Sequence, residues 1–265
     1  MIDFHNHIIP NLDDGSKSIE MSLNMLREAE HQGITDVVNT VHFQHPKMMK
    51  KNTSYDFVIN EINNLQSELD KQNINIKIHP ASEVFFNFNL TKILDNPITT
   101  FGNSKYMLIE FQKLSFPKGY EDEIFKLQLE GITPIIAHPE RYRAVQKDFN
   151  YVRRWIDRGY IIQIDCASIL GKFGKETQIC SKNLLKNEFC HLVGSDAHND
   201  KNRNFLLKDT HEMLNEYIGN EATNIIKNNS KRIFAGKDCL KYNFLNEKKS
   251  FFSLLLGYFK RKKYH

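Results

Sequence analysis

Cysteine is scarce in this sequence, and its few residues do not form the patterns that cysteine chemistry needs. The chain of 265 residues contains four cysteines and no C-x-x-C pair. They stand in apolar or mixed surroundings, which is typical of reduced structural thiols. We therefore expect unpaired cysteines and a cytoplasmic location.

Long hydrophobic runs are also absent. No stretch approaches the roughly 20 apolar residues that are needed to span a bilayer. The first residues, MIDFH, contain neither the basic region nor the apolar region of a secretory signal. We expect a protein that is soluble or bound to the surface of a membrane.

The chain lacks a broad excess of positive charge. Its net charge of +4 arises at the C-terminus, because residues 246–265 contain six lysines and arginines and one glutamate. The rest of the chain carries a net charge of about −1, and it lacks the basic field that nucleic-acid binding usually requires. We therefore expect no nucleic-acid partner.

The C-terminal segment combines apolar and basic residues. Residues 251–259 are rich in Phe and Leu, and the run Lys260-Arg261-Lys262-Lys263 follows. This pattern suits an interfacial segment on anionic lipid, although a packed terminal turn fits it equally well. We expect residues 1–240 to form the folded domain and residues 241–265 to form a tail that is available for peripheral membrane contact.

The rest of the sequence alternates short apolar strands with helices, and no linker rich in Pro, Gly or Ser interrupts it. Strands are predicted at residues 2–4, 36–40, 74–78 (running towards Glu83), 106–111, 133–137, 161–165 and 192–195. Helical sequence follows each strand, so the strands are expected to pair in parallel. This pattern predicts a single-domain α/β fold, a distorted (β/α)7 TIM-like barrel.

Residues of the types that bind metals stand at the ends of these strands. In such a barrel the carboxyl ends of all strands meet at one rim, so residues that are far apart in the sequence converge there. The predicted metal ligands are His5, His7, Asp14, His42, Glu83, Glu110, His138, Asp196 and His198.

Each of these residues alone has an ordinary explanation. A His-x-His pair is often chance, Asp14-Gly15 is typical of a turn, and residues 195–198 could cap a helix. Glu110 is harder to explain, because it stands in an apolar run, where a carboxylate costs several kcal/mol unless a cation compensates it. Ordinary explanations would have to hold at six strand ends at once, which favours a metal cluster.

The predicted ligands combine imidazole with carboxylate and include no thiolate, which suits Mn²⁺, Fe²⁺ or Zn²⁺. Their number is sufficient for two or three ions, with Glu110 expected as a catalytic, bridging carboxylate. Clustered ions lower the pKa of a bound water and polarise phosphoryl oxygens. We therefore expect a metal-dependent phosphoester hydrolase.

Two arginines follow ligand-bearing strand ends. Arg141 comes three residues after His138, and Arg203 comes five residues after His198. A guanidinium can bind two phosphoryl oxygens and offset the charge that grows in the transition state. We expect both to act as catalytic phosphate-binding groups, although their positions alone fit solvated loop arginines equally well.

Together these motifs resemble the polymerase-and-histidinol-phosphatase (PHP) superfamily over roughly residues 1–235. Within it, the chain is similar to the bacterial manganese-dependent protein tyrosine phosphatases of capsular and exopolysaccharide loci. The resemblance implies the PHP fold, a trinuclear manganese cluster held by the nine ligands, and phosphate binding by Arg141 and Arg203. It also implies a phosphotyrosine protein as substrate, namely a tyrosine kinase of polysaccharide assembly. The motifs that carry it are His5-x-His7, Asp13-Asp14-Gly15, residues 132–141 and residues 195–199.

The sequence excludes one related class of enzyme and leaves two alternative functions open. A cysteine-based tyrosine phosphatase needs a C-x5-R loop, and no cysteine of this chain has an arginine six positions later. A PHP phosphatase that acts on a small phosphomonoester, such as histidinol phosphate, would keep every predicted ligand and stays an alternative. A metal-binding scaffold that docks a membrane kinase without turnover is a second alternative, which the C-terminal tail motivates.

Overall fold

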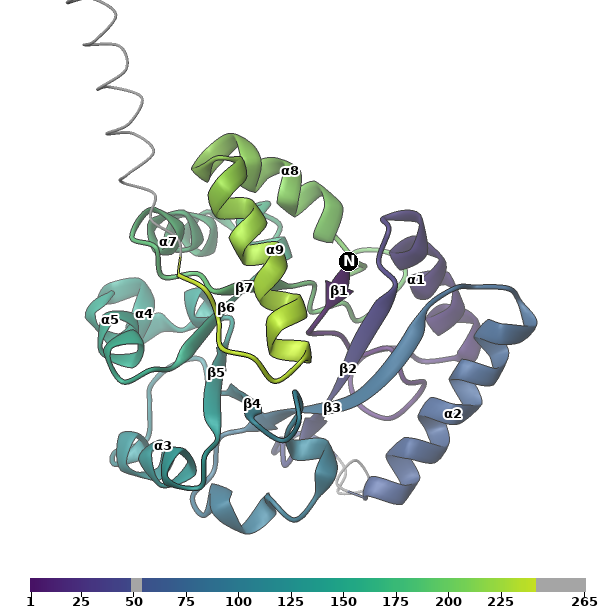
Figure 1. The fold of residues 1–265 in the computed structure, drawn as a ribbon, viewed down its shortest axis with the longest axis horizontal. Helices are drawn as coiled ribbons and strands as arrows, with labels where there is room; N and C mark the ends of the chain where they lie inside the picture. The colour runs from purple at the N-terminus through teal and green to yellow at the C-terminus, as the bar shows by residue number, and fades with distance from the viewer. Residues whose placement is uncertain (49–53, 242–265) are drawn as a thin grey trace, which may run out of the picture.

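A computed structural model describes residues 1–48 and 54–241 of the chain. Seven parallel strands pair in the order of the sequence and curl into a nearly closed barrel (Figure 1). This architecture confirms the predicted distorted (β/α)7 fold. The strands are β1 (Ile2–Asp3), β2 (Asp36–Phe43), β3 (Lys77–Phe85), β4 (Tyr106–Glu110), β5 (Thr133–Ala137), β6 (Ile161–Asp165) and β7 (Leu192–Gly194).

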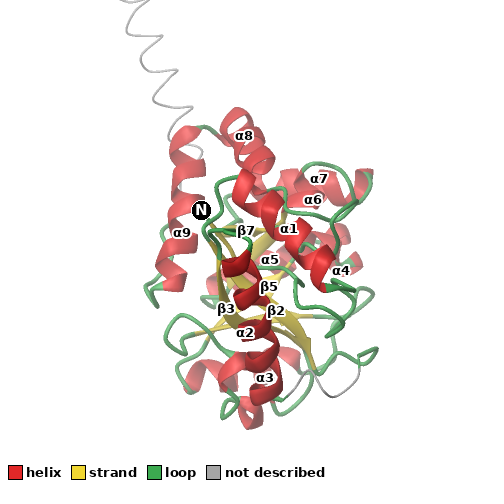
Figure 2. Cartoon of the chain, turned by 90° about the vertical axis from the view of Figure 1, so that its right-hand side faces the viewer, coloured by secondary structure: helices red, strands yellow, loops and turns green. Residues whose placement is uncertain are grey.

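Helices cover the outside of the barrel (Figures 1 and 2). The first of them is typical: Ser18 caps it by accepting the N–H of Met21, and Leu23 and Leu26 are buried at helical spacing. The helices are α1 (Ile19–His31), α2 (Tyr55–Lys71), α3 (Tyr120–Leu129), α4 (Arg143–Lys147), α5 (Asn150–Asp157), α6 (Cys166–Ile169), α7 (Lys175–Lys186), α8 (Leu207–Ile218) and α9 (Asn220–Phe234), with 3-10 turns η2 (Leu90–Ile93), η3 (Pro97–Thr99) and η4 (Pro139–Arg141).

A small apolar cluster fills the inside of the barrel near the amino ends of the strands. Helix α9 contributes Ile233 to this cluster, and its Phe234 packs edge-on against Phe4 with ring centroids 6.4 Å apart. The carboxyl ends of the strands are thereby left for polar side chains. The strands and the segments next to them supply Phe4, Val38, Ala81, Phe101, Tyr106, Leu108, Ile135, Ala137, Ile161 and Leu192.

A buried polar network joins β1 to β7. Asp3 Oδ2 accepts the main-chain N–H of Ser195 at 3.0 Å. Asp3 Oδ1 accepts the Ser195 hydroxyl at 3.0 Å and the Asn6 side-chain amide at 2.9 Å. Main-chain hydrogen bonds of 2.7 and 2.8 Å then join residues 5–7 to residues 196–197. The two ends of the sheet are therefore held side by side.

Two strand boundaries differ by three residues from those that the sequence predicts, and β1, β4 and β7 each end one residue earlier than expected. β2 is three residues longer than expected, and β3 begins three residues later. Ile74 and Ile76 are buried ahead of β3, but their segment turns, since the N–H of Ile76 donates to the carbonyl of Ile74 at 2.9 Å. Consequently His42 and Glu83 lie inside their strands rather than beyond them.

Among the described residues, no helix has both the length and the apolar character that a membrane crossing requires. The basic and apolar part of the tail, residues 242–265, lies outside the described residues. Its membrane contact and the domain boundary at residue 240 therefore stay predictions.

The first prediction concerns the network between β1 and β7. Asp3→Ala should lower the free energy of unfolding by about 3 kcal/mol, because the main-chain N–H of Ser195 and one N–H of the Asn6 amide would be buried without an acceptor. Asp157→Ala, on the exposed side of α5, should change it by less than about 0.5 kcal/mol. Urea denaturation measures both. An Asp3→Ala protein that is as stable as the parent would show that this network does not hold the barrel closed.

Candidate metal centre

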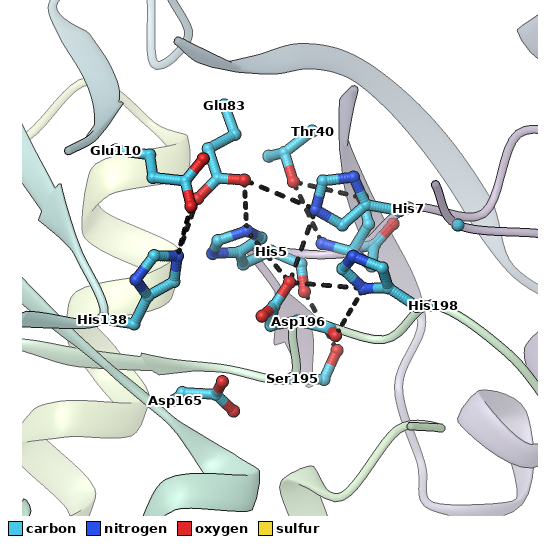
Figure 3. A network of polar contacts seen from close by, with 12 residues as sticks. His5, His7, Thr40, Glu83, Glu110, His138, Asp165, Ser195, Asp196 and His198 are labelled. Atoms are coloured by element: carbon cyan, nitrogen blue, oxygen red, sulfur yellow. Dashed lines mark hydrogen bonds and ion pairs between the residues drawn. The ribbon is translucent and has the colours of Figure 1, made fainter. Parts of the chain in front are cut away.

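The nine predicted ligands converge at the carboxyl-end rim of the barrel. Figure 3 labels all of them except Asp14 and His42. All are buried except Asp14, whose side chain is 49% exposed. In each of four overlapping groups, the possible ligand atoms lie within 4.8 Å of one another. The groups are His7, Asp14, His42 and His198; His5, His7 and Asp196; His5, Glu83 and His138; and His42, Glu83 and Glu110.

Glu83 contacts four of the histidines in these groups, namely His5, His7, His42 and His138. Its Oε2 lies 3.2 Å from His5 Nε2 and 3.5 Å from His7 Nε2. Its Oε1 lies 2.9 Å from His138 Nε2. Glu110 lies farther out, with its Oε1 at 3.8 Å from the same atom of His138. Glu83 is therefore better placed than Glu110 to be a carboxylate shared between ions.

Several ligand atoms of this cluster are better suited to bind cations than to form hydrogen bonds with one another. The Nε2 atoms of His5 and His7 and the Oε2 atom of Glu110 are buried, and none has a hydrogen-bond partner among the described residues. Burial, and then the charge of Glu83, raise the pKa of Glu110 to about 8. A divalent ion would satisfy the free lone pairs and stabilise the ionised carboxylate. The donor set therefore fits divalent metals.

Side chains behind the ligands fix the orientation of two histidines. Asp13 Oδ2 lies 2.8 Å from His7 Nδ1 and also accepts the main-chain N–H of His42 at 3.2 Å. Although burial favours its protonated form, the charge of His7 lowers the pKa of Asp13 to about 2. Gln163 Nε2 lies 2.9 Å from His5 Nδ1. The Nε2 atoms of both histidines are thereby directed into the cluster.

Arg141 and Arg203 meet at the edge of the cluster. Both guanidinium groups donate to the same oxygen of Asp196, Oδ2. Arg141 Nη1 also lies 3.3 Å from Asp165 Oδ2, at the end of β6. The ring of Phe173 packs against both arginines, with its centroid 5.1 Å from Cζ of Arg141 and 5.5 Å from Cζ of Arg203. The two arginines thus form one rigid cationic pair.

Two cavities open beside the centre, and their linings differ. The first, of about 890 Å³, is mainly apolar, with Phe43, Pro46 and Ile93 in its wall, and it includes His45. The second, of about 720 Å³, contains Arg141 and Arg203. A substrate therefore has room on both sides of the cluster.

Four residues of the site were missed by reasoning from the sequence. Asp13 stands next to a predicted ligand, and Asp165 ends a strand, so their positions offered a signal. His45 lies with its ring centroid 4.7 Å from that of His42 and its Nε2 at 4.0 Å from Glu110 Oε2. Phe173, between α6 and α7, carries no pattern in the sequence that points to the arginines.

The comparisons with known proteins agree with this geometry. The family described as "Capsular polysaccharide synthesis, CpsB/CapC" matches residues 1–235. The chain is 32% identical over 232 residues to the tyrosine-protein phosphatase YwqE of Bacillus subtilis, which covers 87% of this chain and 90% of the relative. It is 30% identical over 230 residues to the tyrosine-protein phosphatase CpsB of Streptococcus agalactiae, which covers 84% and 93%.

A solved structure has the same fold over most of both chains. It is described among the crystal structures of YwqE from Bacillus subtilis and CpsB from Streptococcus pneumoniae. Both are described as metal-dependent tyrosine phosphatases. The TM-score is 0.86 at 30% identity, with 91% of this chain and 97% of the other covered. A beta-aspartyl dipeptidase of Fervidobacterium islandicum, with a TM-score of 0.53 at 17% identity and 91% and 77% covered, shares the fold alone.

The contact of Asp13 with His7 leads to a prediction about metal affinity. Asp13→Ala should weaken Mn²⁺ binding about 10- to 100-fold, because His7 loses the group that orients it. Titration of the metal-free protein against a competing chelator measures the affinity. Asp122→Asn, on the exposed side of α3, is the matched control and should bind Mn²⁺ as the parent does. Unchanged affinity in Asp13→Ala would contradict the assignment of His7 as a ligand.

Proposed function

Because the chain belongs to the capsular polysaccharide synthesis family CpsB/CapC, we propose that it is a metal-dependent protein tyrosine phosphatase. Relatives with this activity in their names match it over most of both chains, which supports the assignment. In the reaction, water adds at phosphorus, the tyrosyl oxygen leaves and becomes the tyrosine hydroxyl, and inorganic phosphate is released.

One observation carries this proposal: the two carboxylate oxygens of Asp196 contact different groups, one the histidines of the cluster and the other the two arginines. Oδ1 lies 3.4 Å from Nε2 of His5 and 3.4 Å from Nε2 of His7. Oδ2 accepts from Arg141 and Arg203. A phosphoryl group that binds the arginines is therefore held next to the metal ligands, which is the arrangement that phosphoester hydrolysis needs.

The nine residues of the four groups would hold the metal ions, and Glu83 belongs to two of these groups. Imidazole and carboxylate ligands suit Mn²⁺, and also Fe²⁺ or Zn²⁺; we propose two or three ions, with Mn²⁺ as the native metal. When bound, such ions supply a water of lowered pKa and neutralise phosphoryl charge.

The protein groups hold the phosphoryl oxygens. Arg141 and Arg203 retain N–H donors beyond those that bind Asp196, and these can bind the phosphoryl group in the fork geometry that guanidinium favours. Asp165 and Asp196 fix Arg141 in advance, so little reorganisation is needed when charge grows in the transition state. Glu110 lies at the outer edge of the cluster, 3.7 Å from His42 Nδ1 and 3.8 Å from His138 Nε2.

The substrate proposed is a protein phosphorylated on tyrosine. The family description links the chain to capsular polysaccharide synthesis, and we propose a tyrosine kinase of polysaccharide assembly as the physiological substrate. The large apolar cavity beside His45 supports a substrate bigger than a small phosphomonoester.

Removal of one arginine tests the role of the pair. Arg141→Ala should lower kcat on a phosphotyrosine peptide about 100-fold, which is typical for the loss of one electrostatic contact to the transition state. Its metal content, measured by elemental analysis, should match that of the parent. Loss of metal together with activity would assign Arg141 a structural role instead.

Substrate choice separates the proposed function from its alternatives. The Mn²⁺-loaded protein should hydrolyse a phosphotyrosine peptide with a higher kcat/KM than histidinol phosphate, measured by phosphate release. A preference for histidinol phosphate would identify a small-molecule phosphatase. Binding of metal without turnover of either compound would support a scaffold. Asp196→Ala, which removes a proposed ligand, is the control for background hydrolysis.

A further inference from the structure

The cavity that contains Arg141 and Arg203 is strongly charged. It measures about 720 Å³ and is lined by five basic residues and one acidic residue, together with Leu114, Gln146, Phe173, Gly174 and Thr177. The basic residues are Lys113, Arg141, Arg143, Lys175 and Arg203, and the acidic residue is Glu176.

Buried or neighbouring carboxylates compensate three of these cations. Asp196 binds Arg141 and Arg203, and Glu176 lies 3.0 Å from Arg143. In contrast, no carboxylate of the described residues lies within ion-pair distance of Lys113 or Lys175. The cavity therefore presents two uncompensated ammonium groups beyond the arginine pair.

The field in the cavity is positive even close to the metal ligands. The charge of Arg141, followed by burial, lowers the pKa of Lys113, although Glu110 and Asp196 act in the opposite direction. Lys113 stands in the segment that follows β4. Its main-chain carbonyl accepts the N–H of Arg143, the first residue of α4, at 2.9 Å. Both segments border the same cavity.

Lys175 stands at an unfavourable position for helix stability. It is the first residue of α7, where the positive end of the helix dipole disfavours a cation. The side chain is exposed and is not needed for packing. Helix stability does not explain a lysine at this position, whereas ligand binding does.

The positive charge is local to this cavity. The chain without residues 246–265 has a net charge of about −1. The cavity on the other side of the cluster has one lysine, Lys92, and one carboxylate, Asp95, in a mainly apolar wall. The two sides of the centre therefore offer different chemistry to a bound peptide.

We propose that the cavity lined by Lys113 and Lys175 binds carboxylate side chains close to the phosphotyrosine of the substrate, so that the enzyme prefers acidic phosphopeptides. This proposal rests on the proposed function. An extended peptide advances roughly 3.3 Å per residue, and a cavity of about 720 Å³ has room for a side chain beside the phosphoryl group. Glu or Asp within one to three residues of the phosphotyrosine would pair with the two lysines.

Two phosphotyrosine peptides that differ only in their flanks test the proposal. One has Glu at the flanking positions and the other has Gln. The wild-type protein with Mn²⁺ should show a KM about fivefold to tenfold lower for the Glu peptide, as expected for two exposed charge pairs. This preference should decline as the salt concentration rises from about 0.1 M to 1 M, because the Debye length falls from about 10 Å to 3 Å.

Charge variants test whether Lys113 and Lys175 cause the preference for the Glu peptide. Lys113→Gln/Lys175→Gln should give the same KM for both peptides, and Lys175→Glu should favour a peptide with Lys flanks over the Glu peptide. The matched control is Lys182→Gln/Lys186→Gln. These lysines lie on α7, 5.9 Å from the ring of Tyr217, outside the cavity lining, and their loss should leave the preference for Glu intact.

The outcomes separate this inference from the proposed function. Equal KM values for the two peptides in the wild-type protein would overturn the inference while leaving tyrosine phosphatase activity in place. A preference that survives in Lys113→Gln/Lys175→Gln, or that disappears in the Lys182→Gln/Lys186→Gln control, would also overturn it. Absence of turnover on both peptides would instead reject the proposed function.

Discussion

The site depends on one constraint, the closure of the barrel between its first and last strands. The Asp3–Ser195 network fixes β1 beside β7, and the main chain continues this pairing into the segments that carry the ligands. His5 and Asp196 are thereby brought within 3.4 Å, although 191 positions separate them. Parallel pairing of the intervening strands does the same for the other ligands, since all carboxyl ends face one rim.

The charges of the buried side chains determine which ions and substrates can bind at this rim. The barrel buries Glu83, Glu110 and Asp196 close together, and burial and the charge of Glu83 raise the pKa of Glu110 to about 8. Divalent cations would offset this concentration of carboxylates, and the arginine pair binds Asp196 at the edge of the cluster. The consequence is a gradient from metal ligands through guanidinium groups to the two exposed lysines of the basic cavity, which suits an anionic substrate.

The sequence predicted the barrel and the convergence of nine side chains, because strand alternation and residue type are local properties. It did not predict that Glu83 approaches four histidines, since this approach depends on strand register. Phe173 and Lys113 were also missed: their roles arise where loops from different strands meet. The predicted start of β3 was wrong. Ile74 and Ile76 alternate with polar residues as in a strand, but their segment turns.

Anomalous X-ray diffraction from Mn²⁺-soaked crystals would test the central claim most directly. The account predicts two or three strong anomalous peaks inside the groups formed by His5, His7, Glu83, His138 and Asp196, with Glu83 in contact with more than one ion. Peaks elsewhere on the protein, or no peak among these side chains at saturating Mn²⁺, would contradict it.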